Sequence, residues 1–286
     1  MSEHSEVAPV GFIGLGNMGL PMAQGLAAWP GGLVFCDLNP DIDVAGATRA
    51  DSAAELAKTA GVIGITVLND EQVLAVVAGP NGILETAAAG TVIAIHSTIG
   101  PQTAIDLEKQ CAAQGVSLVD APVSGGADGA KQGRLAIMVG GERDAYLKVK
   151  EPYALVSDML IHAGPVGAGT KMKLARNLLH FIAFTATTEA SRLAEAAGID
   201  IVKLGKVVRH TDAITGGAGA IMLRDTTAPI ARDDFWYDIF THVRGLGEKD
   251  LGLALQLGAE LGVELPLGEI SLERFADGLG VGRDNA

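Results

Sequence analysis

The sequence predicts an α/β domain with a parallel-stranded sheet, followed by an all-α domain that a long helix joins to it. Three observations support this prediction. The first half of the 286-residue chain alternates short apolar runs with segments rich in Ala, Leu, Glu and Gln. Residues 170–197 contain neither proline nor glycine, and no convincing strand follows them. Such alternation is typical of a parallel sheet that helices cover on both faces.

Apolar runs in the first half are the predicted strands. They are Val10–Gly14, Leu33–Asp37, Val62–Val67, Val92–Ile95, Ser117–Asp120 and Leu135–Val139. Because they are apolar along most of their length, we expect them to be buried on both faces. Intervening segments such as Pro101 to Gln114 have the composition of helices.

The second half predicts helices. Thr170 to Ala197 would form a helix about 40 Å long at the usual rise per residue. Gly198 is a suitable C-terminal stop for it. Of the later segments, Asp225–Asp234 is loop-like, and Gly247–Leu261 and Pro266–Asp277 are helical. We therefore expect one domain over residues 1–165 and another over residues 166–286.

Charge and composition exclude several classes of function. A net charge of −13 disfavours nucleic acid and anionic membrane surfaces. No apolar run is long enough to span a bilayer. The six histidines form no ligand-spaced cluster with carboxylates, so no metal site is expected.

The cysteines and the start of the chain predict a reducing compartment. Cys36 and Cys111 are far apart and form no CxxC pair, which disfavours disulfides. The acidic segment Met1 to Glu6 lacks the basic start of a signal peptide. We expect a cytoplasmic protein.

A glycine-rich loop follows the first predicted strand. Gly14-Leu15-Gly16-Asn17-Met18-Gly19 is a complete GxGxxG, and it opens a helical segment. Such glycines allow a tight turn, close approach to a pyrophosphate and close helix–strand packing. In a chain with 38 glycines an ordinary turn is the alternative. The flanking elements favour a dinucleotide site that includes Gly14, Gly16, Asn17, Met18 and Gly19.

Asp37 ends the second predicted strand. Its carboxylate could accept hydrogen bonds from the adenosine ribose and would repel a 2′-phosphate. This favours NAD over NADP, which stays open. The alternative is a turn residue in Asp37-Leu38-Asn39-Pro40.

Four motifs in order resemble the β-hydroxyacid dehydrogenase family. They are the opening motif Gly11–Met22, Asp120-Ala121-Pro122-Val123-Ser124-Gly125-Gly126, the segment Gly164–Gly169 followed by Lys173 and Asn177, and Lys249-Asp250-Leu251. The resemblance implies a Rossmann domain and an all-helical domain, with the active site in the cleft between them. It also implies a small β-hydroxy acid as substrate, interconverted with its semialdehyde or keto acid.

The resemblance assigns catalysis to Lys173 and Asn177. A lysine amine can take the hydroxyl proton if desolvation or nearby positive charge lowers its pKa. An exposed lysine, like neighbouring Lys171, is the alternative. Asn177 is four residues on and therefore shares a helix face with Lys173. Arg176 stands where family members often carry a second asparagine.

The resemblance also assigns binding residues. Ser124, Gly125 and Gly126 would hold the substrate carboxylate, although a simple strand-to-helix turn is the alternative. Thr98 would lie near both nicotinamide and substrate. Leu68 and Lys249 complete the expected cofactor contacts. His96 stands where many relatives carry an aspartate, and a lone histidine is more often structural, so it is not a predicted site residue.

Two rival functions remain open, namely an imine reductase on the same scaffold and a non-catalytic nucleotide-binding protein. We expect substrate specificity to be set around residues 210–223 and 233–237. The aromatic residues at 235–237 would either enclose a larger or less polar substrate or belong to the core or a subunit contact, and we expect the second. The long helix, rich in Ala and Leu, suggests a homodimer or homotetramer.

Overall fold

The computed structural model of the chain describes residues 7–282, so the acidic start, Met1 to Glu6, lies outside the described residues. The chain divides into two compact units, one ending at Arg176 and the other beginning at Asn177. The boundary expected between residues 165 and 166 falls just before a continuous helix, α7 (Ala168–Ala196), whose first turns belong to the first unit. The expected domain limits therefore remain a prediction.

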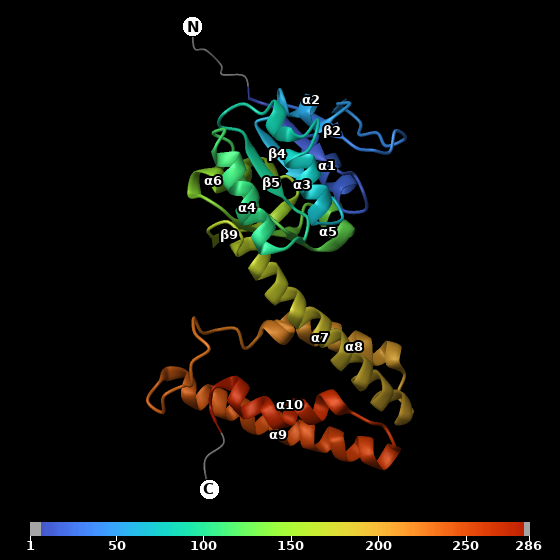
Figure 1. Cartoon of the computed structure of the whole chain (residues 1–286). Coiled ribbons are helices and arrows are strands. Elements are labelled where there is room, and N and C mark those ends of the chain that lie inside the picture. Colours follow the sequence, from blue (N-terminus) through green and yellow to red (C-terminus); the bar gives the residue numbers. More distant parts are fainter. Residues whose placement is uncertain (1–6, 283–286) are drawn as a thin grey trace. The chain divides into compact units, whose positions relative to one another are not determined.

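The first unit is built around a mostly parallel sheet, with helices on both of its faces (Figure 1). The strands are β1 (Val10–Ile13), β2 (Leu33–Cys36), β3 (Thr48–Arg49), β4 (Val62–Ile65), β5 (Val92–Ile95), β6 (Ser117–Asp120), β7 (Val123–Ser124), β8 (Leu135–Gly140) and β9 (Ser157–Gly164). Their order is β3-β2-β1-β4-β5-β6-β8-β7, and β9 pairs with β8. The covering helices are α1 (Gly19–Leu26), α2 (Ala53–Ala57), α3 (Asp70–Ala78), α4 (Pro101–Ala112), α5 (Gly126–Lys131) and α6 (Arg143–Tyr153). The predicted α/β class is confirmed.

The sheet differs from the prediction in its short strands and in its last strands. β8 runs antiparallel to β6 and β7, although it pairs in parallel with β9. Strands β3 and β7 have two residues each, which is too short to produce a hydrophobic pattern. In β9 the side chains of Met159 and Ile161 are 53% and 42% exposed, so this edge strand has no buried apolar run.

The central strands show why the sequence is apolar along their whole length. In β5, Val92 and Ala94 belong to the core cluster on one face, and Ile93 and Ile95 to the cluster on the other. All four are fully buried. Because successive strand residues point to opposite faces, a strand covered on both sides needs an apolar residue at every position. Each such isoleucine stabilises the fold by about 1.5–3 kcal/mol.

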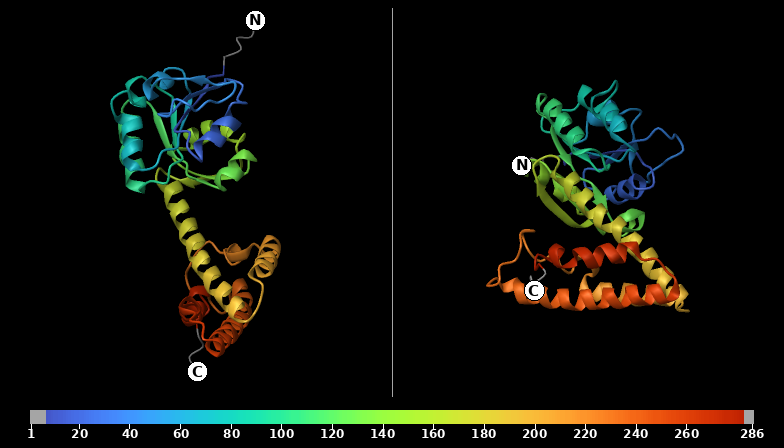
Figure 2. Two further views of the ribbon diagram at one scale, coloured as in Figure 1. Left: turned by 90° about the vertical axis from the view of Figure 1, so that its right-hand side faces the viewer. Right: turned by 60° about the horizontal axis from the view of Figure 1, so that its bottom comes forward.

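The second unit contains only helices among its described residues. After α7 come α8 (Ile201–Thr215), α9 (Phe235–Leu261) and α10 (Pro266–Leu279), and two further views show the pair α9 and α10 lying side by side (Figure 2). The predicted long helix is confirmed within two residues at its start. α9 begins well before the predicted Gly247, because the Asp234 carboxylate caps its first turn by accepting the Trp236 N–H.

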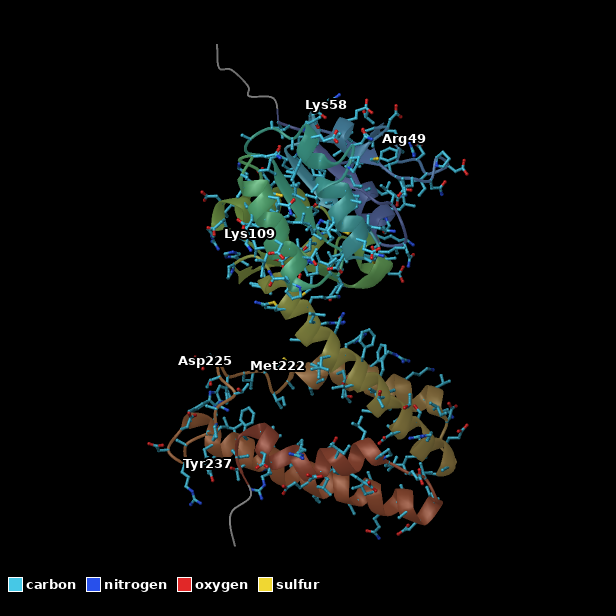
Figure 3. The ribbon with its side chains drawn as sticks, in the orientation of Figure 1. Arg49, Lys58, Lys109, Met222, Asp225 and Tyr237 are labelled. Carbon is cyan, nitrogen blue, oxygen red and sulfur yellow. The ribbon has the colours of Figure 1, made fainter. Side chains whose placement is uncertain are left out.

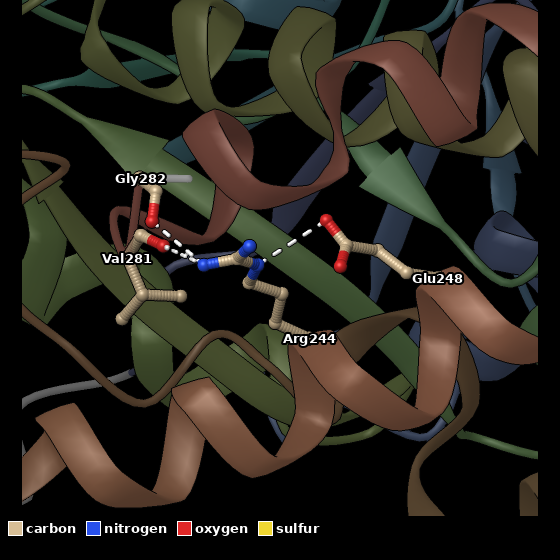
Figure 4. Close-up of polar contacts among 4 residues, drawn as sticks. All are labelled: Arg244, Glu248, Val281 and Gly282. Atoms are coloured by element: carbon tan, nitrogen blue, oxygen red, sulfur yellow. Dashed lines mark hydrogen bonds and ion pairs between the residues drawn. The ribbon is translucent and has the colours of Figure 1, made fainter. Parts of the chain in front are cut away.

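Polar contacts fasten the end of the described chain onto α9. The Arg244 guanidinium donates to the carbonyl oxygens of Val281 and Gly282 at 3.3 and 2.7 Å, and it pairs with Glu248 (Figure 4). A small apolar cluster of Ile230, Phe240, Leu279 and Val281 lies nearby. These contacts hold α9 and α10 together.

The carboxylate of Glu189, on α7, binds the start of α10. It accepts the N–H groups of Leu267 and Gly268 at 2.8 and 3.0 Å and is 6% exposed. A carboxylate at a helix N-terminus satisfies unpaired donors and is favoured by the helix dipole. Over residues 7–282, no helix is both long and apolar enough to cross a membrane.

Candidate active site

The residues predicted to bind cofactor and substrate in the first unit follow parallel strands at one edge of the sheet. The Gly14 loop follows β1, Leu68 follows β4, Thr98 follows β5 and Ser124 lies beyond β6. Leu68 and Thr98 are exposed. This is the edge at which open α/β sheets bind their ligands.

The glycine-rich loop packs tightly against backbone at Gly14 and Gly19 and is open at Gly16. A side chain at Gly14, where φ is +84°, would meet the Thr66 carbonyl oxygen at 2.2 Å. One at Gly19 would meet the Gly14 oxygen at 1.9 Å. Gly16 is exposed and faces open space. Within the described chain, no side chain caps the start of α1 at Met18. Backbone N–H groups there are therefore available to a pyrophosphate. The loop fits a dinucleotide.

Asp37 supports this loop from the end of β2. Its carboxylate accepts the N–H of Leu15 and, at 2.7 Å, that of Asn39. The turn role that the sequence left open is therefore real, and it places a carboxylate directly beside the loop. Arg49 (Figure 3) donates to the carbonyl oxygens of Asp37, Asn39 and Ile42, so its guanidinium is already engaged near this carboxylate.

Lys173 is a buried lysine, in contrast to the exposed alternative. Its side chain is 8% exposed, and Nζ donates to the Val123 carbonyl oxygen at 2.6 Å and to Ser124 Oγ at 2.8 Å. Lys171, two residues before, is exposed. Burial, together with the positive charge of Arg176, lowers the pKa of Lys173. The structure thus brings Lys173 and Ser124 together.

Asp120 anchors the start of α7 and thereby the position of Lys173. The Asp120 carboxylate is fully buried and accepts the N–H groups of Gly167 and Thr170 at 2.7 and 2.6 Å. Burial raises the pKa of Asp120, and these two hydrogen bonds oppose that effect. A side chain at Gly169 would lie 2.3 Å from the Met138 oxygen, so α7 meets the sheet through bare backbone.

The sequence alone does not reveal this anchoring role. It places Asp120 at the end of a predicted strand and at the start of a motif, but it does not show which groups the carboxylate binds. The available signal was a carboxylate that ends an apolar strand and would need buried partners.

Of the remaining predicted residues, two adjoin Ser124 and two lie further along the chain. Gly125 and Gly126 are exposed, with φ of +130° and +66°, so they offer backbone rather than side chains. Asn177 lies one helical turn beyond Lys173 on α7. Lys249 belongs to the second unit, where it is exposed and lies 3.1 Å from Asp250. The predicted roles of these four residues stay predictions.

Two family models together cover almost the whole chain. Residues 9–164 match the NAD binding domain of 6-phosphogluconate dehydrogenase, and residues 167–285 match the NAD-binding domain of NADP-dependent 3-hydroxyisobutyrate dehydrogenase. The chain belongs to the β-hydroxyacid dehydrogenase family. Membership in this family makes the protein an NAD(P)-dependent dehydrogenase that acts on a small substrate.

Several β-hydroxyacid dehydrogenase relatives resemble the chain over most of its length. An uncharacterized oxidoreductase of Mycobacterium tuberculosis is 52% identical, over 98% of this chain and 96% of its own. The mitochondrial 3-hydroxyisobutyrate dehydrogenase of Mus musculus is 32% identical, over 92% of this chain and 79% of its own. A crystal structure of an oxidoreductase from Mycobacterium avium 104 is 50% identical, covers 97% of this chain and 100% of its own, and superposes with a TM-score of 0.92.

The β-hydroxyacid dehydrogenase fold extends to enzymes of other chemistry. The structure of an imine reductase from Pseudomonas sp. covers 96% of both chains with a TM-score of 0.68. At 21% identity this likeness shows the fold alone.

Proposed function

We propose that the protein is an NAD-dependent dehydrogenase that interconverts a small β-hydroxy acid and its semialdehyde or keto acid, with Lys173 as the general acid/base. One observation carries this proposal. Lys173 is buried, its pKa is lowered, and its amine is held by two acceptors from one strand, Val123 O and Ser124 Oγ. A surface lysine would not be desolvated in this way.

The hydrogen bonds of Lys173 suit proton transfer. The Val123 carbonyl oxygen can only accept, so Nζ must donate to it whether the amine is charged or neutral. A neutral amine has two hydrogens, and when it also donates to Ser124 Oγ both are in hydrogen bonds. Its lone pair can then accept the substrate hydroxyl proton. Bound NAD supplies the acceptor for the hydride that leaves the substrate carbon.

Substrate binding is assigned to the segment that also holds the lysine. Ser124 Oγ and the exposed backbone of Gly125 and Gly126 would bind the substrate carboxylate. Thr98 would contact substrate and nicotinamide from the end of β5. Asn177, with an uncharged amide on the same helix face as Lys173, would orient the hydroxyl without adding charge.

The preference for NAD is assigned to Asp37. Its carboxylate lies beside the glycine-rich loop, where it would accept hydrogen bonds from the ribose and repel a 2′-phosphate. The Arg49 guanidinium, which would favour a phosphate, is instead engaged with three carbonyl oxygens.

The decisive test measures NADH produced from NAD across a panel of β-hydroxy acids at alkaline pH, for wild type, Lys173→Ala and Lys171→Ala. We expect Lys173→Ala to lose roughly 10²-fold or more in kcat, because the proton acceptor is gone. Exposed Lys171 is the matched control and should keep wild-type turnover. Wild-type turnover by Lys173→Ala would refute the mechanism.

The same panel separates the rival functions. Cyclic imines reduced faster than any keto acid would establish the imine reductase alternative. NAD binding without turnover of any compound would favour a non-catalytic role.

We further propose that the helical unit forms a homodimer or homotetramer. α8 is described over its whole length and none of its residues is buried. Apolar side chains on it are strongly exposed: Val202 68%, Val207 59% and Ile214 72%. Monomeric proteins rarely leave such a face in water. Light scattering should give a mass of two or four chains, and a monomer at all concentrations would contradict this proposal.

A further inference from the structure

His96 directly follows β5 and is buried, and it has no role in the proposed mechanism. Its side chain is 2% exposed, and Nδ1 lies 2.8 Å from the Ala121 carbonyl oxygen. The ring stacks on Phe12 at 5.9 Å between centroids and meets the edge of Tyr153 at 4.7 Å. These contacts fix both the place and the plane of the imidazole.

The hydrogen bond defines the protonation state of His96. The Ala121 carbonyl oxygen only accepts, so Nδ1 must carry the hydrogen. Nε2 is buried without a hydrogen-bond partner among residues 7–282, which disfavours a second proton there. Burial lowers the pKa of His96 to about 4. At working pH the side chain is therefore a neutral donor with one defined tautomer.

This donor binds the segment that leads to the acceptors of Lys173. The Ala121 N–H donates to the Ile95 carbonyl oxygen at 2.7 Å, and the Ala121 oxygen accepts from His96, so both backbone groups of Ala121 are tied to β5 and the residue after it. Val123, two residues on, accepts from Lys173. Thr98 lies two residues beyond His96.

We propose that His96 is a positioning residue for the reaction. Its Nδ1–H joins the loop after β5, which leads to Thr98, to the connection between β6 and β7, which leads to the Lys173 acceptors in β7. This inference rests on the proposed role of Lys173. Without the hydrogen bond, the buried Ala121 carbonyl would lose its donor, and the Val123–Ser124 acceptors would move relative to Thr98. A misplacement of about 1 Å costs up to roughly 10²-fold in rate.

The test compares two amides at position 96. His96→Asn places an amide nitrogen as far along the side chain as Nδ1 and can restore the donor. His96→Gln places it one bond further out, where it no longer matches the Ala121 oxygen. We expect His96→Gln to lower kcat by roughly 10- to 100-fold while the Kd for NAD changes little, and His96→Asn to stay within a few-fold of wild type.

A pH profile distinguishes positioning from general loss of structure. The two acceptors of Lys173 stabilise its charged form, so loosening them should move the acid limb of kcat/KM for alcohol oxidation to lower pH in His96→Gln. His162→Leu removes a similar bond, from Nε2 to the Gly141 oxygen at 2.7 Å, and is the matched control. It should leave both kcat and the profile unchanged.

Each outcome has one meaning. Equal activity and equal pH profiles for wild type, His96→Gln and His96→Asn would overturn the inference. Loss of activity in Lys173→Ala would in that case still support the proposed function. An equal loss in His96→Gln and His162→Leu, with unshifted profiles, would also overturn it, because the effect would then be structural.

Discussion

The two units of the chain differ in how completely their own residues bury their apolar side chains. In the first unit, both faces of the sheet are covered, and β1 and β5 are buried at every position. In the described part of the second unit, α8 buries none of its residues, and an apolar cluster forms around Ile230 and Phe240. The first unit therefore encloses its own apolar core, whereas the described helices of the second leave many apolar side chains exposed.

The difference in burial between the units should also appear in two helix N-termini, that of α7, which Asp120 binds, and that of α8, which Asp200 caps. Asp120→Ala leaves the N–H groups of Gly167 and Thr170 buried without partners and should cost about 2–6 kcal/mol. It should also lower kcat roughly 10²-fold, since α7 carries Lys173. Asp200→Ala removes an exposed cap of α8 and should cost about 1 kcal/mol without affecting kcat. Denaturant unfolding and initial rates measure both, and equal costs would contradict the comparison.

Acid should destabilise the first unit through His96. The pKa of His96 is about 4 in the folded protein against 6.5 as its ordinary value, so the neutral form is favoured by folding. The contribution of neutral His96 to the free energy of unfolding is fully present above about pH 6.5. It falls by about 1.4 kcal/mol per pH unit toward pH 4, which is about 3 kcal/mol in all.

The raised pKa of Asp120 acts in the opposite direction as the pH falls. The measurement is therefore the difference in unfolding free energy between wild type and His96→Asn from pH 7 to pH 4.5. A difference that does not change with pH would show that His96 is not the neutral buried group.

Nucleotide choice should also reside in the first unit alone. Asp37→Asn removes the negative charge beside the loop and should lower the ratio of kcat/KM for NAD to that for NADP roughly tenfold, about 1.4 kcal/mol. Lys249→Ala, in the second unit, is the control and should leave this ratio unchanged, even if it weakens both cofactors. An unchanged ratio in Asp37→Asn would assign the choice to other residues.

The smallest effect within one chain should come from the exposed face of α8. Val207 is 59% exposed, so Val207→Asp should change the stability of a single chain by less than about 0.5 kcal/mol. In the proposed oligomer the same change would bury a charge, and light scattering should then show dissociation. An intact oligomer would exclude this part of α8 from the interface.

Much of the fold could be predicted from the sequence, because buried parallel strands and a GxGxxG leave strong local signals. The short strand β7 and the edge strand β9 leave none, since their residues are not enclosed. For the site, the family resemblance predicted roles for Lys173 and Ser124, and the two side chains share a hydrogen bond. The contacts of Asp120 and His96 could not be predicted, because they join residues far apart in the chain.

Gly64 in β4 has a consequence for how this sequence can change over evolution. A side chain there would lie 2.5 Å from the Tyr153 hydroxyl and 2.7 Å from the Phe12 ring, the two rings that also enclose His96. Substitution at position 64 therefore requires smaller residues, or shifted rings, at both positions 12 and 153. Among relatives, these positions should vary together, and a change in one alone should be rare.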